Sequence, residues 1–195
     1  MLLLGTYGAN ASFFTLKGEL EAVMNGLRLP KASYTAVKDN PSFHPGRCAA
    51  VSMNGQLLGY IGQVHPVVAK TYGLDCEVYC AEIDFSKAFE MMLPEPTFTP
   101  LPKYPAVTRD LSLVCDEAVT IADLENVITA AGGKLLRKVT LFDIYRGKGI
   151  DEGKKSVAFS LSLRADDRTL TDTDSEAVVT KILEALSTKL NAVLR

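Results

Sequence analysis

The stretch Pro105-Ala-Val-Thr-Arg-Asp-Leu-Ser-Leu-Val114 decides the fold of the second half of this 195-residue chain. Leu111 and Leu113 alternate with Asp110 and Ser112, and this period of two lets a strand bury one face and leave the other in solvent. We therefore predict that this stretch is the first and central strand of a compact domain.

The residues after this strand complete the domain. A helix begins at the capping-box-like Thr120-Ile-Ala-Asp123 and ends at Gly132-Gly133. A strand, a glycine-punctuated hairpin, a strand of unbroken alternation, a second helix and a short closing strand follow at residues 134–145, 146–154, 154–164, 171–190 and 192–195. The order β-α-β-β-α-β predicts a ferredoxin-like domain with two helices on one sheet face and the other face open.

The first half of the chain predicts an antiparallel sheet with short helices. Asn54-Gly55 is a strong hairpin signal between two alternating segments. The other predicted elements are a strand at 1–4, an amphipathic helix at 13–27, strands at 48–53, 56–64 and 77–85, and a short helix from His65-Pro66 to Gly73. The fold class is therefore α+β.

A proline-rich linker separates the two halves. Five of the nine prolines lie within residues 94–105, and proline favours extended backbone because it removes an amide donor and fixes φ. We predict domains at residues 1–93 and 104–195, joined by a linker at 94–103.

Composition excludes several classes of protein. With 47% hydrophobic and 23% charged residues, the chain is typical of soluble globular domains. Its apolar runs are shorter than the roughly 20 residues of a membrane-spanning helix, and residues 1–7 lack the basic start and the cleavage site of a signal peptide. We expect a cytoplasmic protein without a membrane partner. Residues 134–168 contain nine basic and five acidic side chains, which predicts a local positive surface.

No catalytic or metal-binding motif is present in the sequence. The four cysteines and two histidines form no Cys-x-x-Cys or paired-histidine pattern, and no phosphate-binding glycine loop occurs. His44 and Arg47 flank a Pro-Gly turn, which is either a site or simply a turn into a strand, and His65 is read as a helix start. We predict no catalytic residue, no metal and no cofactor site in this chain.

The predicted open sheet face has the composition of an RNA-binding surface. It contains Ser112, Ser160 and Ser162 together with Lys138 and Arg164. Small residues admit a flat ligand and basic ones neutralise phosphate, although an ordinary solvated sheet face would be equally rich in serine.

The predicted hairpin favours RNA binding, because Tyr145, Arg146, Lys155 and Ser156 meet at one end of the sheet, where a base could stack on the ring. The alternative for Tyr145 is local packing at the sheet edge. Phe142 is a further candidate, with a core or interdomain contact as its alternative.

Several motifs resemble one known family. The segments are Lys-Tyr-Pro-Ala-Val-Thr-Arg-Asp-Leu-Ser-Leu-Val (103–114), Leu-Phe-Asp-Ile-Tyr-Arg-Gly (141–147), Lys-Lys-Ser-Val-Ala-Phe (154–159), Asp-Arg-Thr-Leu-Thr-Asp (167–172) and Leu-Arg (194–195). They resemble the ferredoxin-fold anticodon-binding domain of the β subunit of bacterial phenylalanyl-tRNA synthetases. Phe-His-Pro-Gly-Arg-Cys-Ala (43–49) and Gly-Tyr-Ile-Gly-Gln-Val-His-Pro (59–66) resemble the end of the catalytic-like domain of the same subunit.

The resemblance implies part of an α2β2 ligase that charges phenylalanine tRNA with ATP and magnesium. It implies that the catalytic site lies on the α subunit and that residues 1–93 are a degenerate, non-catalytic class II synthetase module. It also implies that the second domain binds the anticodon stem-loop of phenylalanine tRNA, with no role for DNA. Tyr145 would stack on an anticodon base and Ser156 would lie near another.

The remaining candidates do not come from the resemblance. Lys138, Arg146, Lys155 and Arg164 are expected from charge alone to contact tRNA. Arg109, Asp110 and Asp143 belong to the motifs, but a buried Arg–Asp pair would explain them equally well. Two other functions stay open, which are a ferredoxin-like sensor of a small molecule and a structural interface fragment that binds no RNA.

Overall fold

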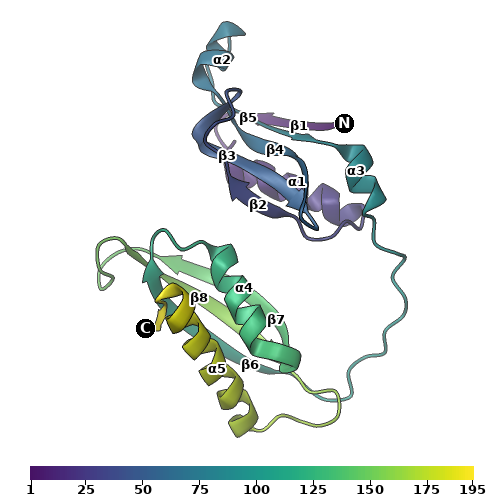
Figure 1. Ribbon diagram of the computed structural model, residues 1–195, viewed down its shortest axis with the longest axis vertical. Helices are drawn as coiled ribbons and strands as arrows, with labels where there is room; N and C mark the ends of the chain where they lie inside the picture. The colour runs from purple at the N-terminus through teal and green to yellow at the C-terminus, as the bar shows by residue number, and fades with distance from the viewer. The chain divides into compact units, whose positions relative to one another are not determined.

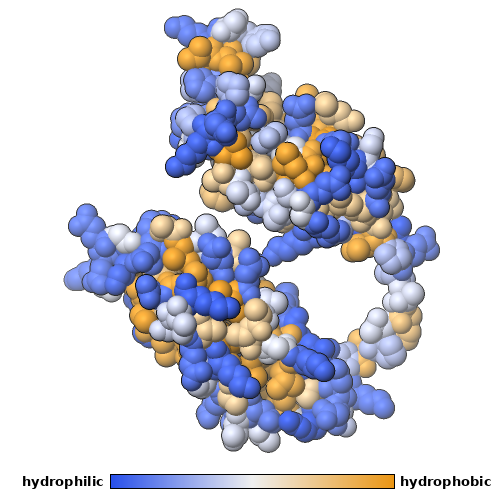
Figure 2. Space-filling view, viewed as in Figure 1, coloured by the Kyte–Doolittle hydropathy of each residue, from blue (hydrophilic) through white to orange (hydrophobic).

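The structure is a computed structural model that describes residues 1–195. The chain divides into two compact units, Met1–Phe98 and Thr99–Arg195, and each unit has its own sheet and its own hydrophobic core (Figure 1). Residues 94–106 contain no helix or strand. Phe98 and Leu101 in this segment are both 90% exposed, and hydrophobic residues show along the narrow connecting chain in Figure 2.

The first unit is a five-stranded antiparallel sheet with three helices. Its elements are β1 (Leu2–Tyr7), α1 (Phe13–Gly26), β2 (Ser33–Ala36), β3 (Phe43–Met53), β4 (Gln56–Val64), α2 (Pro66–Thr71), β5 (Val78–Ile83) and α3 (Phe85–Glu90). The strand order is β1-β5-β4-β3-β2. The core joins Leu16, Leu20 and Met24 of α1 to buried residues of the three central strands.

Most predicted elements of this unit are confirmed, including the hairpin at Asn54-Gly55 between β3 and β4. Strand β2 and helix α3 were not predicted, because four and six residues are too short to show a period. Strand β3 begins at Phe43 and not at Cys48, since an irregularity between these residues interrupts its pairing with β4.

Two glycines of β4 explain the Gly-Tyr-Ile-Gly motif. A Cβ at Gly59 would lie 1.8 Å from the Glu82 carbonyl oxygen, and one at Gly62 would lie 2.5 Å from the Arg47 carbonyl oxygen. Only glycine fits where another backbone approaches this closely. The motif is therefore required by the packing of β4 between its neighbours.

The second unit has the predicted order of strands and helices. Its elements are β6 (Val107–Asp116), α4 (Ile121–Gly132), the 3-10 turn η1 (Gly133–Leu135), β7 (Leu136–Tyr145), β8 (Lys154–Leu163), α5 (Asp172–Leu190) and β9 (Val193–Leu194). The sheet order β7-β8-β6-β9 is antiparallel throughout and places β6 and β8 at the centre. Both helices cover the same sheet face (Figure 1). The ferredoxin-like β-α-β-β-α-β fold is thus confirmed.

The core of the second unit lies between this face and the two helices. Leu111 and Leu113 of β6 and Phe159 of β8 are almost fully buried, as are Ile128 of α4 and Ile182 of α5. Both helices begin with a capping box, Thr120 with Asp123 and Thr171 with Asp174.

Candidate nucleic-acid interface

The sheet face that carries no helix is the candidate interface. Residues directly opposite each other in neighbouring strands share a face, and Phe159 and Leu161 of β8 point into the core. The alternate positions of β8 and the residues paired with them therefore lie on the uncovered face. This face includes Ser112, Thr108 and Asp110 of β6, Ser156, Ser160 and Ser162 of β8, and Lys138, Thr140, Asp143 and Tyr145 of β7.

A β-bulge places Tyr145 on this face. Leu141 is opposite the core residue Phe159, whereas Asp143 is opposite Ala158, so Phe142 is an extra residue in β7. Strict alternation would give Tyr145 the same face as Leu141, but a one-residue bulge switches every later side chain to the other face. Tyr145 is consequently opposite Ser156.

Several contacts fix the ring of Tyr145, which is 38% exposed. Its hydroxyl donates a 3.3 Å hydrogen bond to the Lys148 carbonyl oxygen. A Cβ at Gly147 would lie 2.8 Å from this hydroxyl oxygen, so glycine lets the ring lie close to the hairpin backbone. The guanidinium carbon of Arg195 lies 5.5 Å from the ring centroid, within the range of a cation–π contact. The ring is accessible and held in one orientation.

Ser156 and Phe142 lie in different environments from those expected. Ser156 is only 3% exposed although no helix covers its face. Neighbouring side chains must therefore cover it, and Tyr145 is directly opposite. Phe142 is 57% exposed and belongs to no core cluster, so the alternative of a core contact is wrong for this residue.

The expectation that Lys155 lies beside Ser156 as a surface cation is also wrong. Lys155 is opposite Cys115 and has the same strand face as the core residue Val157. It is 6% exposed, and its Nζ donates to the Glu117 carbonyl oxygen at 2.9 Å. Adjacent residues of a strand point to opposite faces, which is why Lys155 and Ser156 are separated.

The other cations lie at opposite ends of the sheet. Arg146 lies beside Tyr145, but its guanidinium is bound by both carboxylate oxygens of Glu117, with a shortest distance of 2.7 Å. This contact lowers the pKa of Glu117 and raises that of Arg146. Lys138 is opposite Ser162, six residues along β8 from Ser156, which is about 20 Å at the usual rise of a strand. Arg164 follows at the same end, and its Nε is buried without a hydrogen-bond partner.

The polar residues of the first unit are bonded to one another. Nη1 of Arg47 contacts Gln63 Oε1 at 2.8 Å, Glu77 Oε1 at 2.9 Å and Tyr79 Oη at 3.2 Å. The side chain of His44 accepts the Gly46 N–H. These side chains already hydrogen-bond to one another or to the backbone, so their polar groups are not available to a substrate. The contacts favour the interpretation of this segment as a turn into a strand and not as a site.

The prediction that His65 starts a helix can be compared with the structure. Nδ1 of His65 caps helix α2 by accepting the Val67 N–H, as the sequence predicted. All four cysteines are free thiols, and no group of three or more His, Cys, Asp or Glu side chains is placed to hold a metal ion. No helix is long and apolar enough to cross a membrane.

The sequence did not predict three contacts around the hairpin. Glu117, Gly147 and Arg195 all contact the Tyr145–Arg146 segment. Glu117 is 29 residues from Arg146, and Arg195 directly follows β9, the strand at the opposite edge from β7. Contacts between residues this distant in sequence leave no local pattern, so only the terminal Leu-Arg motif gave a signal for Arg195.

Comparisons with known proteins agree with this fold. The family model of the ferredoxin-fold anticodon binding domain matches residues 102–195, and the model of the phenylalanyl tRNA synthetase beta chain CLM domain matches residues 3–85. The phenylalanine–tRNA ligase beta subunit of Clostridium acetobutylicum is 40% identical over 195 residues, which are 100% of this chain and 24% of that protein. Those of Bacillus licheniformis and Bacillus subtilis are 44% and 42% identical over 183 residues, which are 94% of this chain and 23% of each protein.

The fold and both family matches define a synthetase-type module joined to an anticodon-binding domain, which is the construction of a tRNA synthetase subunit. The chain spans about a quarter of the length of the curated relatives it matches. It belongs to the family of phenylalanine–tRNA ligase β subunits.

Proposed function

We propose that this chain is the part of a phenylalanine–tRNA ligase β subunit that binds the anticodon stem-loop of phenylalanine tRNA. The observation that carries the proposal is the ring of Tyr145, which is accessible on a sheet face without helices and is held at the hairpin by Lys148, Gly147 and Arg195. An exposed aromatic ring beside small polar residues is the surface on which unpaired bases stack. Phe142 and Asp143 are the exposed neighbours that a bound loop would meet, whereas Ser156 is covered beside the ring.

The cations of this face have different roles according to their position along the sheet, and these roles are assigned from charge alone. Lys138 and Arg164 lie at the end distant from Tyr145 and would meet phosphates of the stem or of the far side of the loop. Arg146 is near the ring but is paired with Glu117. Of these three cations, Lys138 and Arg164 therefore contribute most to the attraction of phosphate.

Catalysis belongs to another subunit under this proposal. The α subunit of an α2β2 assembly in the cytoplasm would bind ATP and magnesium and form phenylalanyl-tRNA, while residues of the first unit serve as a non-catalytic module. The side chains of this chain do not fit magnesium or ATP, because no metal-ligand cluster is present and Arg47 is bonded within its own unit. Each relative is named as a phenylalanine–tRNA ligase beta subunit, which supports this division of work.

Titration of a labelled anticodon stem-loop of phenylalanine tRNA tests the proposal. The affinity should fall about tenfold between roughly 50 and 200 mM salt if two to three phosphates are neutralised. A stem-loop of equal length with a different loop sequence serves as the control and should bind more weakly. Absence of salt-dependent binding would leave a role in subunit assembly alone.

A further inference from the structure

Glu117, the residue after β6, makes three contacts with the hairpin of residues 145–155. Its N–H donates to the Gly153 carbonyl oxygen at 2.8 Å, and its own carbonyl oxygen accepts from Lys155 Nζ at 2.9 Å. Its carboxylate accepts from Nε and Nη2 of Arg146. One residue therefore connects the end of β6 to both arms of the hairpin that carries Tyr145.

The hydrogen bond from Lys155 explains why a lysine is buried at this position. A buried ammonium group is costly unless it is hydrogen-bonded, and Lys155 is 6% exposed with its Nζ on the Glu117 carbonyl oxygen. Its neighbours in the sheet face the helices and not the open surface. Lys155 is thus placed to hold the β6–α4 connection and is not placed to meet a phosphate.

We propose that Glu117 and Lys155 are positioning residues for RNA binding, which act by fixing the hairpin that carries Tyr145 and Arg146. Together with Arg146 they form what we call the hairpin clamp. The inference rests on the proposed function of Tyr145. A stacking platform fixed in advance loses less conformational freedom when a base binds, so the clamp raises affinity without touching the RNA.

The clamp and simple electrostatics predict opposite signs for one substitution. Removal of a negative charge from a phosphate-binding surface strengthens binding if only Coulomb attraction matters. Glu117→Ala removes such a charge but also releases Arg146, so the clamp predicts weaker binding. Glu152→Ala removes the same charge from an exposed position of the same hairpin, without any contact to Arg146 or Lys155.

The first measurement is the titration of the anticodon stem-loop with the full chain and these two variants. We expect Glu117→Ala to bind roughly threefold to tenfold more weakly and Glu152→Ala to bind as well as the parent chain or slightly better. In a Tyr145→Ala background, Glu117→Ala should have no further effect, because the clamp acts through the ring. Binding by Glu117→Ala that equals or exceeds the parent affinity would overturn the inference, as would an undiminished effect in the Tyr145→Ala background.

The second measurement separates Lys155 from the phosphate-binding lysines. Lys138→Met should reduce the slope of log affinity against log salt by about 0.7, because one phosphate contact is lost. Lys155→Met should weaken binding at every salt concentration and leave this slope unchanged. A slope that falls equally in both variants would make Lys155 a phosphate contact and overturn its positioning role.

Hydrogen exchange without RNA distinguishes a failure of the clamp from a failure of the proposed function. Amides of residues 146–153 should exchange faster in Glu117→Ala than in Glu152→Ala, because the hairpin opens more readily. Unchanged exchange would overturn the clamp even if the parent chain binds RNA. Faster exchange in a chain that binds no stem-loop would confirm the clamp as a structural device and reject both its role in RNA binding and the proposed function.

Discussion

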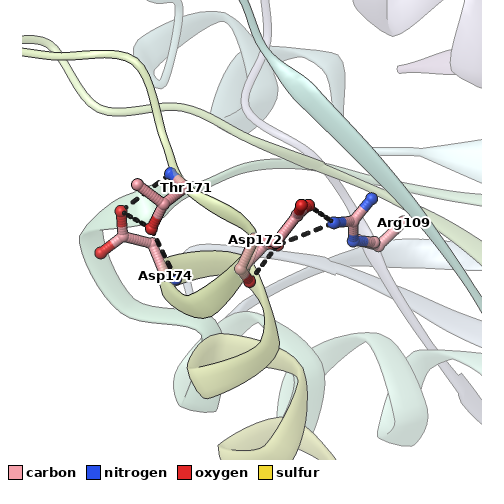
Figure 3. Close-up of polar contacts among 5 residues, drawn as sticks. Arg109, Thr171, Asp172 and Asp174 are labelled. Atoms are coloured by element: carbon pink, nitrogen blue, oxygen red, sulfur yellow. Dashed lines mark hydrogen bonds and ion pairs between the residues drawn. The ribbon is translucent and has the colours of Figure 1, made fainter.

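The guanidinium of Arg109 on β6 contacts the carboxylate of Asp172 at the first residue of α5, with 2.5 Å between Nη2 and Oδ1 (Figure 3). The same Nη2 donates to Ser175 Oγ at 3.1 Å, and the Ser175 hydroxyl donates to the Asp172 carbonyl oxygen at 2.8 Å. Arg109 and Asp172 belong to two of the motifs that carried the family resemblance. Their contact joins the central strand to the start of the last helix and gives both residues a structural role.

Arg109→Met should lower the free energy of unfolding of the second unit by about 1 kcal/mol. The ion pair is largely exposed, with Asp172 at 87%, and exposed pairs contribute roughly 0.2–1 kcal/mol; the lost bond to the buried Ser175 adds a similar amount. Urea denaturation measures the change, and Arg137→Met, which removes another exposed pair, is the matched comparison. Loss of stem-loop binding at undiminished stability would instead place Arg109 in the RNA interface.

Gly59→Ala should unfold the first unit and leave the second folded. The new methyl group would lie 1.8 Å from the backbone oxygen of Glu82, and backbone cannot move aside as a flexible side chain can, so the cost should exceed the roughly 1–3 kcal/mol of ordinary overpacking. The two units have separate cores, so Phe159 and its neighbours are unaffected. Near-ultraviolet circular dichroism and stem-loop titration should show a partly unfolded chain that still binds RNA.

The control for this substitution is Gly18→Ala in α1, where a Cβ meets nothing within 4 Å. It should keep or raise stability, because alanine favours helix more than glycine does. A chain with Gly59→Ala that loses the structure of both units together would show that they fold as one cooperative body.

The cap of α5 should make the second unit less stable in acid. The Thr171 N–H and hydroxyl donate to Asp174 Oδ2 at 2.9 and 2.8 Å (Figure 3). Arg168 is paired with the same carboxylate. The backbone hydrogen bond from Thr171, then its hydroxyl and then Arg168, lower the pKa of Asp174 from its ordinary value of 3.8. The carboxyl therefore adds stability that is present above pH 3.8 and is lost as the pH falls through the lower folded value.

Asp174→Asn tests this contribution. Stability near neutral pH should fall, as expected for the loss of a helix cap, and the decline of stability below about pH 4 should become shallower. Urea denaturation at a series of pH values measures both quantities, with Thr171→Val as a second variant that removes the hydroxyl donor. An acid decline as steep as that of the parent chain would assign acid sensitivity to other carboxylates.

The sequence predicted the strands and helices whose residues follow a long, unbroken period. Phe159 and Leu161 of β8 alternate with Ser160 and Ser162 over the whole strand, and the structure buries the first pair and not the second. Asn54-Gly55 carries its own turn geometry, since Asn54 has φ of 51° and Gly55 of 80°. In both cases the decisive information lies within a few residues, which is why sequence reasoning succeeds.

The face of Tyr145 shows why the site was harder to predict. Periodicity assigns Tyr145 to the face of Leu141, and only the bulge at Phe142 turns it outward. A bulge is a property of the pairing between two strands, and β7 alone contains no signal for it. Lys155 was misplaced for the opposite reason. Alternation correctly assigns it to the buried face of Val157, but its charge led to the expectation that it lies on the surface.

This chain alone should form no phenylalanyl adenylate. Its network of Arg47, Glu77 and Tyr79 is satisfied internally, with a 2.8 Å bond from Tyr79 to Glu77, and it has no cluster of metal ligands. An assay of phenylalanine-dependent exchange between pyrophosphate and ATP should show no activity above background, and addition of a ligase α subunit serves as the positive control. Exchange by the isolated chain would place a catalytic site here.

Tyr145→Ala should weaken binding of the anticodon stem-loop by about 1–3 kcal/mol, because a base loses its stacking partner. The domain should stay folded, since the ring is 38% exposed and belongs to no core cluster. Tyr145→Phe keeps the ring and loses only the 3.3 Å bond to the Lys148 carbonyl oxygen, so most of the affinity should remain. Tyr72→Ala, at a ring 78% exposed in the first unit, is the control that should bind like the parent chain. Equal affinities for Tyr145→Ala and Tyr72→Ala would remove the stacking role, because the ring would then contribute nothing that a distant exposed tyrosine does not.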